Sequence, residues 1–186
     1  MELLVTSPVG FINGLSVPAA KFVIFCGTTL GGLAVLWAVA YIMFRPLPKH
    51  GAHRPLRDLR RRILNLGLVF VSVGWAYLGS VALKNYFKIG RPDILNFDLT
   101  PLLKLTDYGF PSGHATFYSA LAVSVFFIER RAGVFLGLVA LTVGAARIVA
   151  GVHTPLDIVG GYLLGIFTAA LVDFLAQYVS KKSVAK

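Results

Sequence analysis

The sequence predicts an all-α fold, a polytopic transmembrane helix bundle with about five spanning helices and a short interfacial segment at the N-terminus. Three observations favour this class: 56% of the 186 residues are hydrophobic, only 14% are charged, and the mean hydropathy is +0.75. Soluble domains are far more polar than this. Because the length is that of one ordinary domain, we expect residues 1–186 to form a single unit.

The first two predicted helices are long runs without a charge. Residues 22–44 give 23 uncharged positions, which at about 1.5 Å per residue exceeds the roughly 30 Å hydrocarbon thickness of a bilayer. Residues 63–83 give 21 more, so we expect both runs to cross the membrane. Residues 1–20 contain two prolines and two glycines and lack the basic start of a signal peptide. They are predicted to lie at the outer interface.

Three further apolar runs hold only 14 or 15 residues between charges: 115–128, 132–146 and 158–172. Such lengths are more typical of buried core helices than of membrane spans. The residues that bound these runs change this interpretation, because a helix can carry an ionisable side chain at its end when that side chain faces a polar cavity. We therefore expect each helix to extend to spanning length through its flanking residue, namely His114, Arg147 and Asp157.

The distribution of basic residues predicts the orientation. The 45–62 loop, the 129–131 turn and the C-terminal tail carry 12 of the 18 lysines and arginines, which assigns them to the cytoplasm. The N-terminus and residues 84–114 are then expected on the periplasmic or exterior side of the cell inner (plasma) membrane. Topology also accounts for the net charge of +10, so no nucleic-acid partner is expected.

Three segments on this outer side contain a cation or a histidine, and their convergence would indicate an anionic ligand. In residues 111–114, Pro-Ser-Gly-His, Ser112 is a natural N-cap and Gly113 leaves backbone amides open at a helix N-terminus, which binds anions. Capping alone explains these two residues equally well. His114 shifts the interpretation toward a binding site.

The second histidine precedes the last helix. Thr154, Pro155 and Asp157 form a capping box that needs no further explanation. His153 stands directly before the cap, however, and Asp157 is within reach of an imidazole nitrogen, which would fix the tautomer. A histidine held in this way is a better nucleophile, so catalysis and a structural role both stay open for His153.

Lys84 and Arg91, taken singly, would be ordinary interfacial anchors. Arg147 ends an apolar helix and therefore requires an anion or a polar cavity. Lys88 and Lys104 are expected to be solvated or to contact lipid headgroups. The sequence contains no Cys/His/Asp cluster with the spacing of metal ligands, so neither a metal nor another cofactor is expected.

Together these residues resemble the three signature motifs of the type 2 phosphatidic acid phosphatase superfamily. The matching residues, in order and spacing, are Lys84 with Arg91 and Pro92, then 111–114, then Arg147 with His153 and Asp157. The resemblance covers roughly residues 63–173. It departs from the family at Ala146, where the family usually has serine, so one hydrogen bond to phosphate is expected to be missing.

The resemblance implies a metal-independent phosphatase with His153 as nucleophile, Asp157 as its support and His114 as general acid. It implies a phosphate cradle of six residues: Lys84, Arg91, Ser112, Gly113, His114 and Arg147. The implied partner is a lipid phosphate from the bilayer. Undecaprenyl diphosphate is the first candidate, and phosphatidylglycerol phosphate, phosphatidic acid and lipid A phosphate are alternatives.

Two other functions stay open. A lipid phosphotransferase would form the same phosphohistidine and pass the phosphate to a second lipid instead of water. An anion or lipid transporter would use the cradle to move phosphate across the bilayer, although the uncharged centres of the first two helices disfavour it. No pattern in the sequence indicates the oligomeric state.

Overall fold

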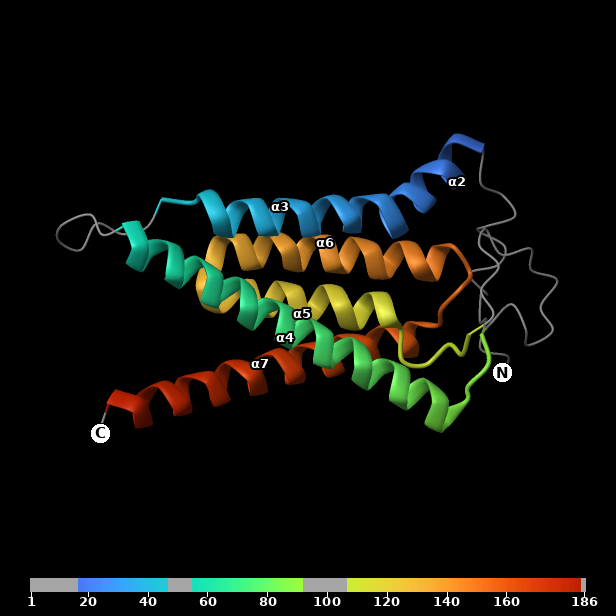
Figure 1. Ribbon diagram of the computed structural model, residues 1–186. Coiled ribbons are helices and arrows are strands. Elements are labelled where there is room, and N and C mark those ends of the chain that lie inside the picture. The colour runs from blue at the N-terminus through green and yellow to red at the C-terminus, as the bar shows by residue number, and fades with distance from the viewer. Residues whose placement is uncertain (1–16, 47–54, 92–106, 185–186) are drawn as a thin grey trace.

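The computed structural model describes residues 17–46, 55–91 and 107–184, and every regular element in these ranges is helical. Figure 1 shows an elongated bundle whose helices run along a common direction. The elements are α2 (Val17–Ile24), the π-helical turn η1 (Phe25–Thr29), α3 (Leu30–Phe44), α4 (Pro55–Phe87), α5 (Gly113–Ile128), α6 (Arg130–Val149) and α7 (Pro155–Val184). The predicted all-α bundle is confirmed.

Within the described residues, four helices are long and apolar enough to cross a membrane: Pro18–Phe44, Pro55–Phe87, Arg130–Val149 and Pro155–Lys182. The chain is therefore a multi-pass membrane protein. All three short helices extend through the expected flanking residue, because α5 begins at Gly113, α6 continues through Arg147 and α7 begins two residues before Asp157. The first helix starts earlier than predicted, at Val17, so residues 17–20 belong to it and not to an interfacial segment. Residues 1–16 of that segment lie outside the described residues.

The third predicted span, α5, is shorter than expected. It has 16 residues, about 24 Å, with Ser112 at its N-cap and Glu129 at its C-cap. Glu129 has an extended backbone and is also the N-cap of α6, where its side chain accepts hydrogen bonds from the amides of Arg131 and Ala132. α5 packs against α4, α6 and α7 at the centre of the bundle, so much of its surface contacts other helices instead of lipid (Figure 1).

Small residues allow α5 and α7 to approach closely. A Cβ atom at Gly161 would lie 2.7 Å from the carbonyl oxygen of Ser112, and one at Gly165 would lie 2.3 Å from that of Thr116. These two glycines are four residues apart on α7, the small-xxx-small spacing typical of tightly packed membrane helices. The contact fixes the N-terminus of α7 beside that of α5.

The three segments singled out in the sequence lie at one end of the bundle. The C-terminus of α4, the N-terminus of α5 and the turn from α6 to α7 meet there, and the α5–α6 turn and the C-terminal end of α7 lie at the other end (Figure 1). The chain leaves α4 through Lys88, which has φ 51°, and the amide of Gly109 donates to the carbonyl oxygen of Ile89 at 2.8 Å. This bond holds residues 107–112 against the end of α4.

Candidate active site

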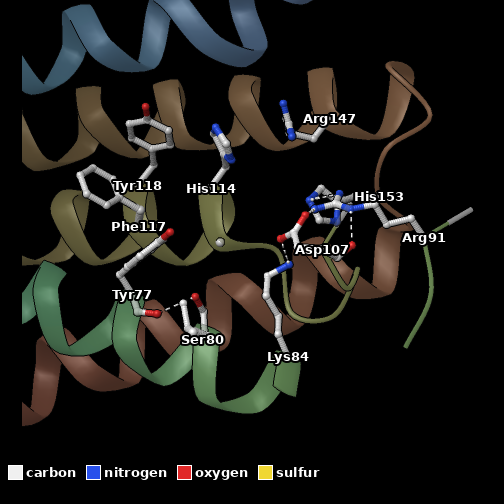
Figure 2. A pocket seen from close by; sticks show the side chains of 12 residues that line it. Tyr77, Ser80, Lys84, Arg91, Asp107, His114, Phe117, Tyr118, Arg147 and His153 are labelled. Carbon is white, nitrogen blue, oxygen red and sulfur yellow. Dashed lines mark hydrogen bonds and ion pairs between the residues drawn. The ribbon is translucent and has the colours of Figure 1, made fainter. Parts of the chain in front are cut away.

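A cavity of about 300 Å³ opens at this end of the bundle, and Figure 2 shows the side chains that line it. It brings together six of the eight site residues predicted from the sequence: Lys84, Arg91, Gly113, His114, Arg147 and His153. Ser112 and Asp157 lie behind this lining and are both buried. Three cations and two histidines from three separate segments therefore face one cavity.

Arg91 ties these segments together. Its Nε donates to the carbonyl oxygen of Asp107 at 2.9 Å, and its Nη1 donates to that of Val152 at 2.7 Å. Nη1 also lies 3.2 Å from Nε2 of His153, and Nη2 donates to the Asp107 carboxylate. The guanidinium is buried and makes these bonds with a fixed fork of donors, which lysine does not have.

Lys84 is buried in the last turn of α4. Its Nζ donates to the carbonyl oxygen of Tyr108, and it pairs with Oδ2 of Asp107 at 3.0 Å. Both partners belong to the segment that precedes α5. This pairing holds the ammonium group at the edge of the cavity (Figure 2).

The capping interpretation of Ser112 agrees with the structure. Its Oγ accepts a hydrogen bond of 3.5 Å from the amide of Ala115, and its own amide donates to the carbonyl oxygen of Asp157 at 2.9 Å. The next two residues, Gly113 and His114, line the cavity. In Figure 2 the His114 ring lies between Tyr118 and Arg147.

His153 and Asp157 are both buried and form the expected pair. Nδ1 of His153 lies 3.4 Å from Oδ2 of Asp157, and the same oxygen accepts from the amide of Thr154 at 2.8 Å. The hydroxyl of Thr154 accepts from the Asp157 amide at 3.2 Å, which completes the capping box. Asp157 therefore caps α7 and orients the histidine with one carboxylate.

The surroundings of His153 favour the neutral ring. Burial lowers the pKa of His153 below its ordinary value, although the hydrogen bond with Asp157 opposes this shift. With Nδ1 facing the carboxylate and Nε2 facing a donor on Arg91, the arrangement fits a proton on Nδ1 and a lone pair on Nε2. That is the form in which an imidazole acts as a nucleophile.

Arg147 differs from the other two cations. Its side chain is buried, and its Nε has no hydrogen-bond partner among the described residues. A buried donor without a partner is costly, so an anion in the cavity would stabilise this group. The preceding residue, Ala146, is buried at the contact with Gly27 of η1 and is not part of the cavity lining.

Sequence reasoning missed Asp107, which belongs to none of the three motifs but lines the cavity. Burial opposes its ionisation, but hydrogen bonds from Arg91 and Lys84 outweigh this and lower the pKa of the carboxyl. Sequence reasoning also missed five residues that line the cavity. Each lies three, four or seven positions from Lys84 or His114, and residues with this spacing share one face of a helix. These are Tyr77, Ser80, Val81, Phe117 and Tyr118.

Fold and site together define a class: polytopic membrane proteins with a cavity lined by cations and histidines at the ends of their helices. Within that class, the chain belongs to the PAP2 superfamily, whose model matches residues 65–181. The family predicted from the three motifs is confirmed.

Three curated relatives carry different names. Over 74 residues the chain is 35% identical to bacitracin transport permease protein BcrC of Bacillus licheniformis, covering 40% of this chain and 36% of that protein. Over 69 residues it is 41% identical to undecaprenyl-diphosphatase of Sulfolobus acidocaldarius, covering 37% and 34%. Over 125 residues it is 30% identical to phosphatidylglycerophosphatase B of Bacillus subtilis, covering 61% and 59%. The chain thus matches between about a third and three fifths of the length of these relatives.

Among solved structures, the crystal structure of Aquifex aeolicus LpxE is similar, with a TM-score of 0.69 and 22% sequence identity. The match covers 92% of this chain and 95% of that one. At this identity the likeness shows the shared fold.

Proposed function

We propose that this protein is a membrane lipid phosphatase that hydrolyses a phosphomonoester or diphosphate headgroup through a phosphohistidine on His153. One observation carries the proposal. His153 has Nδ1 against the Asp157 carboxylate and Nε2 beside Arg91, in a cavity that two further cations and a second histidine also line. Family membership supports the same reaction class.

In the proposed mechanism, Nε2 of His153 attacks phosphorus in line and the bond from phosphorus to the leaving oxygen breaks. Asp157 stabilises the imidazolium that develops, and His114 gives its proton to the leaving oxygen. A water molecule then attacks the phosphohistidine, His114 accepts a proton from it, and the phosphorus–nitrogen bond breaks to release phosphate. The charge on the equatorial oxygens would be stabilised by five residues: Lys84, Arg91, Ser112, Gly113 and Arg147.

An apolar groove supports a lipid substrate. A second cavity of about 240 Å³ lies between α3 and α4, is lined almost wholly by apolar side chains, and shares Tyr77 and Phe117 with the polar cavity. An amphiphile could therefore place its phosphate among the cations and its tail in this groove. We propose that undecaprenyl diphosphate is the first candidate, and that the site faces the periplasm or exterior with the C-terminus in the cytoplasm.

Phosphate release tests the proposed function directly. Purified protein in detergent with EDTA is expected to release inorganic phosphate at about 1 s⁻¹ or faster from at least one lipid. The panel consists of undecaprenyl diphosphate, phosphatidylglycerol phosphate, phosphatidic acid and lipid A phosphate. If release depends entirely on a second lipid, the protein is a phosphotransferase. If every lipid is inert, hydrolysis is wrong and flux measurements in vesicles would test transport.

Filling the apolar groove should affect only substrates with long tails. Gly74 lines the groove, and a Cβ atom there would have no neighbour within 4 Å, so Gly74→Leu is expected to add apolar volume to the groove. We expect KM for a long-chain lipid phosphate to rise about tenfold, because a competing side chain displaces the tail. KM for a short soluble monoester should be unchanged.

The matched control is Gly67→Leu, on the same helix and equally unobstructed, but not part of the groove. An equal rise in both variants, or a rise for the short ester as well, would argue against a tail site between α3 and α4.

A further inference from the structure

Asp107 occupies an unexpected position in the candidate active site. Its two carboxylate oxygens pair with Lys84 and Arg91, two of the three cations proposed to bind phosphate. Its side chain is 55% exposed, whereas those of Lys84 and Arg91 are 10% and 3% exposed. An accessible carboxylate therefore already pairs with two buried cations. The buried Nε of Arg147, in contrast, has no partner among the described residues.

These two cations do not need the carboxylate of Asp107 to hold their positions. Nζ of Lys84 also donates to the carbonyl oxygen of Tyr108, and Nη1 of Arg91 donates to that of Val152 at 2.7 Å. Nε of Arg91 is held by the backbone oxygen of Asp107, and not by its carboxylate. Rotation of the Asp107 side chain toward solvent would thus leave both cations anchored by backbone oxygens.

We propose that Asp107 is a specificity-determining residue that competes with the phosphate group of a ligand for Lys84 and Arg91 and rejects phosphates with a single negative charge. The inference rests on the proposed function. A phosphodiester carries one charge, as the carboxylate does, so exchanging one for the other gains little electrostatic energy. A phosphomonoester or diphosphate carries at least one charge more and gains from Lys84, Arg91 and Arg147 together.

The lowered pKa of Asp107 supports this role, because the carboxylate stays charged under ordinary conditions. Rejection of singly charged phosphates would also be useful to any enzyme that works at a membrane surface. Most phospholipid headgroups are phosphodiesters, and they would reach the same cavity laterally in large excess over the substrate. A competing carboxylate keeps them from occupying it.

Binding of two small phosphates tests the proposal without requiring turnover. Titration calorimetry at pH 8 on the full chain in detergent compares inorganic phosphate, mainly a dianion, with dimethyl phosphate, a monoanionic diester. Wild type should bind inorganic phosphate and bind dimethyl phosphate far more weakly. In Asp107→Asn, which keeps the size of the side chain, the affinities for both ligands should rise by a similar factor of about tenfold or more, because neither ligand has to displace a carboxylate from Lys84 and Arg91. The weak binding of dimethyl phosphate should then become measurable.

Two further variants make the result decisive. Asp107→Glu keeps the charge and should retain the rejection of the diester. Asp173→Asn removes a carboxylate near the other end of α7, in a separate pocket with Arg61, and should change neither affinity. If Asp107→Asn weakens both ligands, or leaves diester binding unchanged, Asp107 merely positions the cations and the proposal is wrong. Because binding is measured directly, failed hydrolysis by the wild type would contradict the proposed function and not this inference.

Discussion

Replacing His153 with alanine is expected to abolish hydrolysis, lowering kcat/KM for a lipid phosphate by about four orders of magnitude or more. His114 is not expected to take its place as the nucleophile, because among the described residues only His153 of the two cavity histidines has a carboxylate partner. The cationic cradle would still bind the phosphate. KM should therefore change much less than kcat.

Replacing His114 should have a different effect, since its proposed role is to protonate the leaving oxygen. His114→Ala is expected to lose about two to four orders of magnitude on a lipid phosphate. With p-nitrophenyl phosphate, whose leaving group needs no proton, the first step should recover. The phosphohistidine would then accumulate, because the second step lacks its general base.

The measurement is rapid denaturation during turnover, followed by detection of protein-bound phosphate that is labile to acid and stable to base. The label is expected on His114→Ala and on wild type, and not on His153→Ala. Thermal unfolding of each variant controls for loss of the fold. Label on His153→Ala, or hydrolysis above a tenth of the wild-type rate, would remove His153 from the nucleophile role. If the phosphate label were absent only from His114→Ala, His114 would be the nucleophile and His153 the general acid.

Charge-free runs located the long helices of the described residues, because charged side chains are rare within hydrocarbon. Two helices extend well beyond their runs: α4 begins at Pro55, inside the expected 45–62 loop, and α7 continues to Val184. The same rule placed His114, Arg147 and Asp157 inside helices, and the structure confirms all three. Only the length of α5 was wrong, because a helix that packs against three others does not have to match the bilayer. The three motifs identified the six cavity residues, since each of these residues lies at or near the end of a helix.

Asp107 and the apolar groove could not be found in this way. The carboxylate reaches Lys84 and Arg91 only because residues 107–112 fold back along residues 88–91, a tertiary path that no local pattern encodes. The groove depends on how far apart α3 and α4 lie. Hydropathy cannot distinguish side chains that line such a groove from those that face lipid.

Gly165→Ala is expected to destabilise the protein more than its size suggests. The added Cβ would lie 2.1 Å from Oγ of Ser119 and 2.3 Å from the carbonyl oxygen of Thr116, so the backbones of α5 and α7 must separate. A cost of about 3 kcal/mol is expected, at the upper end for overpacking, because backbone atoms cannot rotate away as side chains do. Thermal unfolding in detergent measures it.

Activity should fall even where this variant stays folded. α5 carries His114 and α7 carries Asp157, so separating the two helices moves the general acid away from His153. The matched control is Gly137→Ala on α6, where a Cβ would have no neighbour within 4 Å and a small gain in helix propensity is expected. Equal stability of the two variants would mean that α5 and α7 are not in close contact. Reduced stability with unchanged kcat/KM would mean that their spacing does not set the distance between the histidines.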